Sequence, residues 1–150
     1  MANDKLKFNS RTIHGGQQPD KAYGSVMPPV YLTSTYAQTK PGEHLGYEYS
    51  RSHNPTRTAL ENSLASIESG KHALAFASGM AAIDAVIKLL QPGDEVISTN
   101  DLYGGTYRIF TKIFANYGIK FHFVPMGELD QVEKHINKNT KLLWVETPTN

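Results

Sequence analysis

The sequence contains no cysteine. This absence excludes a disulfide framework, a zinc site built on thiolates and a cysteine nucleophile within the 150 residues. The six histidines do not compensate for it, because no two of them have the four-residue spacing that places a pair of metal ligands on one helix face. We therefore expect no metal site.

The sequence also lacks an excess of charge and a long apolar run. Fifteen Lys and Arg against fourteen Asp and Glu give a net charge of +1, without a basic cluster for nucleic acid. The most apolar stretch, residues 72–90, is interrupted by polar residues, so we expect no membrane span. The N-terminus has no apolar signal core, which makes a cytoplasmic location the expectation. The predicted partners are small molecules and other protein subunits.

Residues 1–50 contain many glycines and prolines and show no sustained helical or alternating period. They predict an extended, irregular N-terminal arm. Such a long irregular segment is uncommon inside a compact domain, so it is either disordered or ordered by lying on another subunit. Its apolar residues favour the second interpretation: Val26, Val30, Tyr31, Leu32 and Tyr36.

Residues 51–150 alternate between helical and strand patterns. Asn54 and Pro55 begin the first helix as N-cap and first helical residue, and Gly70 ends it. This order predicts an α/β fold with a mainly parallel sheet covered by helices, whose ligand binds beyond the carboxyl ends of the strands. Strands are predicted at 73–77, 95–99, 120–124 and 141–145, and further helices at 79–90, 109–117 and 129–136.

Three candidate positions follow predicted strands. Ser78, Gly79 and Met80 form a strand-to-helix turn, where free N–H groups and the helix dipole can bind a phosphate, although one glycine in such a turn is also routine packing. Tyr103, beside two glycines, is either a platform for a planar cofactor or a half-buried loop aromatic. Glu146 either orients a substrate or pairs with an arginine.

Other residues give weaker signals. Arg51, close to Tyr49, either makes a forked contact to a phosphate or is a surface arginine. His122, within an apolar strand, is expected to be a packed or edge residue and not a base. The P-loop pattern and the three-glycine dinucleotide fingerprint are both absent, which argues against a nucleoside triphosphatase and a nicotinamide dehydrogenase.

Four motifs occur together in one order, and jointly they are far more specific than any of them alone. They are Tyr49-Ser50-Arg51 with Asn54-Pro55-Thr56, Ala77-Ser78-Gly79-Met80-Ala81-Ala82, Tyr103-Gly104-Gly105-Thr106 and Glu146-Thr147-Pro148-Thr149-Asn150. With them, residues 11–150 resemble the Cys/Met-metabolism family of enzymes dependent on pyridoxal 5'-phosphate (PLP). The resemblance implies an aspartate-aminotransferase-like fold type I, with 1–50 as an arm on a neighbouring subunit and 51–150 as the first half of the PLP-binding major domain.

The resemblance also implies how the cofactor phosphate is held. Ser78 and the backbone of Gly79 and Met80 would bind the phosphate of their own chain. Tyr49 and Arg51 would reach the phosphate that a partner subunit binds.

Further implied roles concern the cofactor ring and the substrate. Tyr103 would stack on the pyridine ring and take part in proton transfer as a catalytic residue, and Asn150 would lie by the ring hydroxyl. Tyr49, Arg108 and Glu146 would lie at the substrate end of the site. The cofactor-binding lysine, the aspartate for the pyridine nitrogen and the arginine for the substrate carboxylate come later in this family. We therefore expect this chain to be the N-terminal portion of a longer enzyme.

The implied activity is gamma-elimination of cystathionine to cysteine, 2-oxobutanoate and ammonia, by a homotetramer whose active sites are shared across a dimer. Cystathionine gamma-synthase or another lyase of the family is the alternative, and Gly105 argues against methionine gamma-lyase, which usually has a cysteine there. A hypothesis of another class is a non-catalytic binding or assembly module. We expect it less, because half a parallel sheet would expose an edge and apolar surface that isolated domains avoid.

Overall fold

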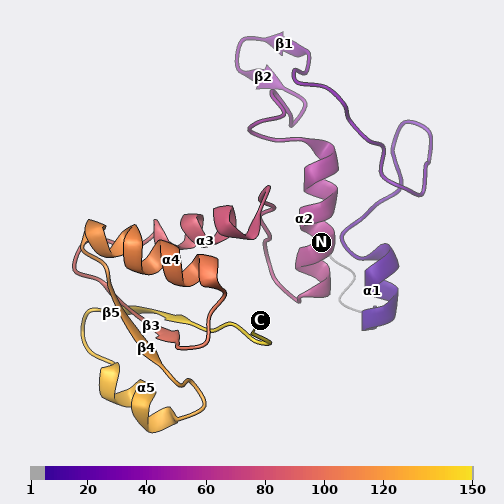
Figure 1. Cartoon of the computed structure of the whole chain (residues 1–150). Coiled ribbons are helices and arrows are strands. Elements are labelled where there is room, and N and C mark those ends of the chain that lie inside the picture. The colour runs from indigo at the N-terminus through magenta and orange to yellow at the C-terminus, as the bar shows by residue number, and fades with distance from the viewer. Residues whose placement is uncertain (1–5, 150) are drawn as a thin grey trace. The chain divides into compact units, whose positions relative to one another are not determined.

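The computed structural model describes residues 6–149, which form two compact units (Figure 1). The first unit is Met1–Ala75 and the second is Phe76–Asn150. The first predicted helix therefore belongs to the same unit as residues 1–50, whose role as an arm toward another subunit stays a prediction. In the described part of the chain, no helix combines the length and the apolarity needed to cross a bilayer.

The second unit is built on a three-stranded parallel sheet in the order β4-β3-β5. Its strands are β3 (Glu95–Thr99), β4 (Lys120–Val124) and β5 (Thr140–Trp144). All residues of the central strand β3 are buried, as expected for a strand with neighbours on both edges and helices on both faces. The predicted α/β fold with a parallel sheet is confirmed.

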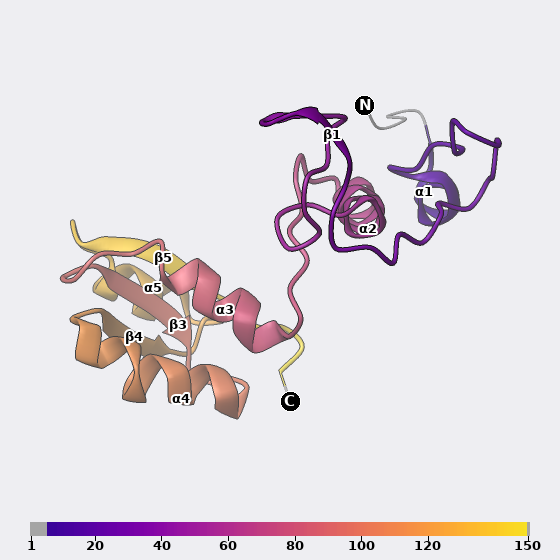
Figure 2. The same cartoon turned by 90° about the horizontal axis from the view of Figure 1, so that it is seen from above.

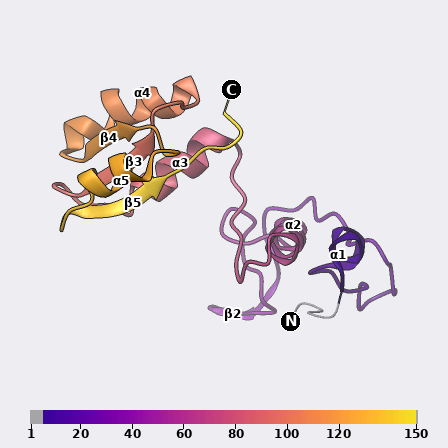
Figure 3. The same cartoon turned by 90° about the horizontal axis from the view of Figure 1, so that it is seen from below.

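Helices cover both faces of this sheet. α3 (Gly79–Ile87) and α4 (Gly104–Lys112) lie on one face, which is seen from above in Figure 2, and α5 (Leu129–His135) lies on the other, seen from below in Figure 3. Because side chains alternate along a strand, Val96 packs under α3 and α4, whereas Ile97 packs under α5. The first core consists of Ile87, Val96, Phe110, Phe114 and Ile119, and the second of Ile97, Val124 and Val132.

The predicted strand at 73–77 is wrong. The segment pairs with no strand in the described residues, and Leu74 and Phe76 are 77% and 45% exposed. Its apolar run has the composition of a buried strand, but a strand also needs a neighbour whose hydrogen-bond ladder it can complete. The backbone N–H of Ala75 donates to the Glu61 carboxylate at 3.0 Å, which is a side-chain contact and not a ladder bond.

Two predicted helices in the second unit differ at their ends. α3 ends at Ile87 rather than at Leu90. The helix predicted at 109–117 is interrupted after α4 and continues as the 3-10 helix η1 (Phe114–Tyr117). Gly118 ends it as predicted, with a left-handed φ of 82°.

The first unit is organised by α2 (Pro55–Ile67), which begins as predicted. Asn54 is its N-cap, and the side-chain oxygen of Asn54 accepts a hydrogen bond from the Thr56 N–H at 2.8 Å. Gly16, with a φ of 70°, lies so close to α2 that a Cβ would overlap the Asn62 carbonyl.

Residues 1–50, predicted to be irregular, contain three short regular elements. α1 (Phe8–His14) packs along α2, where Arg11 Nη1 donates to the Ser66 carbonyl at 2.8 Å. A short antiparallel hairpin also forms from β1 (Gln38–Lys40) and β2 (Glu43–His44). These elements are too short to give a period in the sequence, and α1 is stabilised by its contact with α2.

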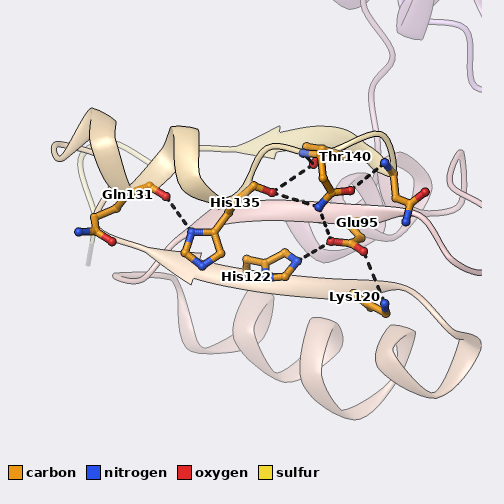
Figure 4. Close-up of polar contacts among 8 residues, drawn as sticks. Glu95, Lys120, His122, Gln131, His135 and Thr140 are labelled. Atoms are coloured by element: carbon orange, nitrogen blue, oxygen red, sulfur yellow. Dashed lines mark hydrogen bonds and ion pairs between the residues drawn. The ribbon is translucent and has the colours of Figure 1, made fainter.

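Glu95, at the start of β3, ties the amino ends of the strands together (Figure 4). Its side chain is 8% exposed, and the carboxylate accepts hydrogen bonds from Asn137 Nδ2 at 2.9 Å and His122 Nε2 at 2.7 Å, with Lys120 Nζ at 3.5 Å. The bonds from Asn137 and His122 outweigh the opposing effect of burial and lower the pKa of Glu95 from 4.5 to about 2. His122 is thus an edge-strand residue with a structural partner, as the sequence predicted.

We predict that Glu95→Gln lowers the thermal unfolding midpoint of the full-length protein at neutral pH, because glutamine has one acceptor oxygen and no charge. The pKa of Glu95 is lower in the folded state, so the wild-type advantage is complete above about pH 4.5 and is lost as the pH falls toward 2. Scanning fluorimetry from about pH 7 to about pH 3 measures this difference. Glu133→Gln, at an exposed position of α5, is the control. A difference in unfolding midpoint between wild type and Glu95→Gln that does not change with pH would contradict the lowered pKa of Glu95.

Candidate active site

The carboxyl ends of the strands lie at one side of the second unit, where ligands of parallel sheets bind. The starts of α3 and α4 and the segment that follows β5 lie at this side (Figure 2). The structure therefore brings together three of the predicted groups: the turn at 78–80, Tyr103 and Glu146.

The turn into α3 has the geometry of an anion site. Ser78 is the N-cap, and Ser78 Oγ accepts a hydrogen bond from the Ala81 N–H at 3.2 Å. The backbone N–H groups of Gly79 and Met80 have no hydrogen-bond partner among the described residues. Apart from its two chain neighbours and the nearby backbone of α3, no atom of the described residues lies within 4 Å of the position that a Cβ of Gly79 would occupy. Two unpaired donors thus lie at the positive end of a helix.

Tyr103 lies at the start of α4, close to this turn. The residue is 48% exposed, and its ring lies beside Gly105, where a Cβ would overlap the ring and would be 2.8 Å from Met80 Sδ. A cavity of about 450 Å³ opens beside these three residues and is also lined by Arg108. Met80 therefore connects the two features, because its N–H belongs to the anion site and its sulfur lies beside the aromatic ring.

Glu146 follows β5 and points back toward α4. Its carboxylate accepts three hydrogen bonds, from Tyr103 N at 2.8 Å, Thr106 Oγ1 at 2.7 Å and Trp144 Nε1 at 3.0 Å. Burial raises the pKa of Glu146, but these bonds together lower it more, so the pKa lies below its ordinary value. In the described residues Glu146 makes no ion pair with an arginine, one of the two roles the sequence left open.

Other predicted residues of the second unit lie close to this group. Arg108 is exposed on α4 and makes no ion pair among the described residues. Asp101 accepts a hydrogen bond from Thr149 Oγ1 at 2.6 Å, which ties the loop after β3 to the segment after β5 a second time. Asn150 lies outside the described residues.

Tyr49 and Arg51 belong to the first unit, in the turn before α2. The Arg51 guanidinium lies 5.0 Å from the centre of the Tyr49 ring, within the range of a cation–π contact. The turn is fixed by a bridge between Tyr49 and Thr35 and by the bond from Ser50 N to the Ser34 carbonyl at 2.8 Å. Apart from its contact with the Tyr49 ring, Arg51 makes no hydrogen bond or ion pair in the described part of the chain, so its N–H groups are available to an anion.

The sequence did not reveal Thr106 and Trp144 as parts of this site. One signal was present, because an indole N–H at the end of an apolar strand needs an acceptor, and the Glu146 carboxylate follows two residues later, just beyond the strand. Thr106 gave no such signal, since its full burial is a consequence of the fold. The described residues contain no cluster of His, Asp or Glu that could hold a metal ion.

Comparisons with known proteins show the family to which the chain is similar. Residues 9–150 match the family model described as Cys/Met metabolism PLP-dependent enzyme. The chain is 51% identical to a cystathionine gamma-lyase of Bacillus subtilis over 97% of the chain and 38% of the relative. It is 50% identical to a probable cystathionine gamma-synthase of Herpetosiphon aurantiacus over 95% of the chain and 45% of the relative.

A solved structure supports the fold as well. The crystal structure of cystathionine gamma-lyase from Lactobacillus plantarum, complexed with L-serine, has a TM-score of 0.91 at 44% identity, over 97% of this chain and 38% of that one. The chain thus spans less than half of the length of each of these relatives.

We predict that Gly105→Ala in the full-length protein displaces the Tyr103 ring, because a Cβ at this position overlaps it. Overpacking of this kind costs about 1–3 kcal/mol unless the ring rotates away. Gly104→Ala is the control, since no side chain or distant backbone lies within 4 Å of a Cβ there, and it should leave the protein as stable as wild type or more stable by up to about 1 kcal/mol. Crystal structures and unfolding midpoints of both variants test this. A Gly105→Ala protein with an unmoved ring and an unchanged midpoint would refute it.

Proposed function

The chain belongs to the Cys/Met-metabolism family of PLP-dependent enzymes, and we propose that the full-length protein is a cystathionine gamma-lyase. It would eliminate the gamma-thiol of cystathionine and release cysteine, 2-oxobutanoate and ammonia. The family implies PLP as the cofactor, and its members act on sulfur amino acids in transsulfuration reactions.

The observation that supports a PLP-dependent reaction, whether elimination or replacement, is the pairing of a candidate anion site with a half-exposed aromatic ring. PLP has a phosphate and a planar ring, and the two features match these two parts. The N–H groups of Gly79 and Met80 are free to donate to a phosphate, and Met80 Sδ lies beside the Tyr103 ring. The described residues therefore fit the cofactor that the family implies.

PLP, when bound, supplies the electron sink for carbanion chemistry. The chain's own residues would bind, orient and move a proton. Ser78 satisfies the Ala81 N–H and leaves those of Gly79 and Met80 for the phosphate. The Tyr103 ring would hold the planar ring by stacking, and its phenol oxygen would take or give a proton at the substrate amine. Arg108, beside the cavity, would attract an anionic group of the substrate.

We propose that residues 1–50 lie on a neighbouring subunit and that Tyr49 and Arg51 complete the neighbour's phosphate site. The free guanidinium of Arg51 supports this, as do apolar side chains that the first unit leaves exposed, among them Tyr23 and Leu32 at 95% each. Apolar surface of this extent is typical of an interface. The assembly would be a homotetramer made of dimers that share their active sites, with 51–150 as the first half of the PLP-binding domain.

Cystathionine gamma-synthase is the second candidate. The chain is 50% identical to a probable gamma-synthase and 51% identical to a gamma-lyase, so overall similarity favours neither activity. Both reactions require the same phosphate site and the same stacked ring. They differ in whether cysteine is the product or the nucleophile that attacks an activated homoserine.

The test of the activity uses the purified full-length enzyme. With cystathionine alone we expect cysteine and 2-oxobutanoate to appear in equal amounts. In a parallel reaction the enzyme receives an activated homoserine and cysteine, and cystathionine is measured. Formation of cystathionine in the second reaction, with no product in the first, would replace the gamma-lyase by the gamma-synthase.

The shared active site predicts complementation between two inactive variants. Arg51→Ala removes the contact from the neighbour, and Gly79→Asp places a negative charge in the phosphate site without a clash in the fold. Equal co-expression should give hybrid dimers with one intact site, which restores about a quarter of the wild-type activity. Lys21→Ala, which removes another cation from the first unit, is the control and should leave the enzyme active on its own. Failure of the mixture to recover activity, with dimers formed, would place Arg51 in its own chain's site.

A further inference from the structure

Glu146 accepts hydrogen bonds on both carboxylate oxygens from donors of its own chain. Oε1 accepts from Thr106 Oγ1 and Trp144 Nε1, and Oε2 accepts from the Tyr103 N–H. All three partners are neutral donors, and both carboxylate oxygens are engaged. A side chain that binds substrate in its free state would leave an oxygen directed at the cavity, so this arrangement favours an intramolecular role.

Two of the three donors are fixed in the core. Thr106 is fully buried, and the indole of Trp144 packs edge-on against Phe110 with ring centres 5.5 Å apart. Phe110 is itself fully buried. The third donor, Tyr103, is the half-exposed residue. The carboxylate of Glu146 therefore connects the rigid core to the backbone of Tyr103.

The position of the carboxylate at the start of α4 reinforces this connection. Tyr103 is the N-cap of α4, and its own side chain accepts no capping hydrogen bond. Glu146 accepts a hydrogen bond from the N–H of this N-cap residue, as the glutamate of a capping box does. A capping-box glutamate belongs to the helix that it caps, whereas Glu146 lies in the segment after β5. A negative charge is also favourable at the positive end of a helix. A second hydrogen bond, from Thr149 Oγ1 to the Asp101 carboxylate, holds the same loop two residues before Tyr103.

We propose that Glu146 is a positioning residue for Tyr103 and not a ligand of the substrate. By fixing the Tyr103 backbone, it sets the place of the ring that would stack on PLP. The role of the ring rests on the proposed function, whereas the hydrogen bond to the Tyr103 N–H can be tested in the protein without cofactor.

The experiment compares full-length Glu146→Gln with wild type. Glutamine keeps the shape of the side chain but has only one acceptor oxygen. Its NH2 group would therefore face at least one of the three donors, and that hydrogen bond would be lost. Hydrogen–deuterium exchange of peptides covering 101–106, measured without PLP, should be at least about tenfold faster. Titration with PLP should then show about tenfold weaker binding. Glu133→Gln, which removes an exposed carboxylate from the same unit, should change neither.

A milder pair of variants keeps the test decisive if Glu146→Gln does not fold. Thr106→Val removes one donor to Glu146 and should raise exchange at 101–106 in part, whereas Thr106→Ser keeps the hydroxyl and should not. Unchanged exchange and PLP affinity in Glu146→Gln, with a raised KM, would overturn the proposal in favour of substrate binding. A wild-type protein that does not bind PLP would refute the proposed function, while the exchange result would still decide the role of Glu146.

Discussion

The central strand β3 is the constraint on which the second unit depends. It is paired in parallel with β4 and β5 and is buried on both faces, with Val96 and Ile97 in different cores. Because parallel strands end at the same edge, helices that run back over the sheet must begin there. The N-termini of α3 and α4 and the segment after β5 share that edge for this reason. The candidate active site is thus a consequence of the topology.

At each end of the sheet one carboxylate contacts three donor groups, but the two carboxylates connect different elements. Glu95 is nearly buried and bonds to residues of β4 and of the loop before β5, so it fixes the strands to each other. Glu146 bonds to the start of α4, so it fixes a helix and a loop to the sheet. We expect the first to contribute to the stability of the fold, and we propose that the second contributes to the geometry of the candidate site.

The sequence predicted those features that local patterns determine. The N-cap at Asn54, the start of α3 at Gly79 and the strand at 95–99 depend on adjacent residues, and all three form. The run at 73–77 satisfies the same local pattern but has no neighbouring strand, which its composition cannot reveal. The helix α1 was missed for the opposite reason, since its contact with α2 stabilises it more than its own sequence does.

The same distinction divides the candidate site into two parts. The anion site at 78–80 is local, because the N-cap Ser78 and the first turn of α3 suffice to orient its N–H groups. The position of Tyr103 is not local, because it depends on a carboxylate 43 residues away in the sequence. A change that loosens the end of β5 should therefore displace Tyr103 before it alters the turn at 78–80. Since a ligand with a phosphate and a ring must meet both parts at once, the long-range hydrogen bond limits how precisely it can be held.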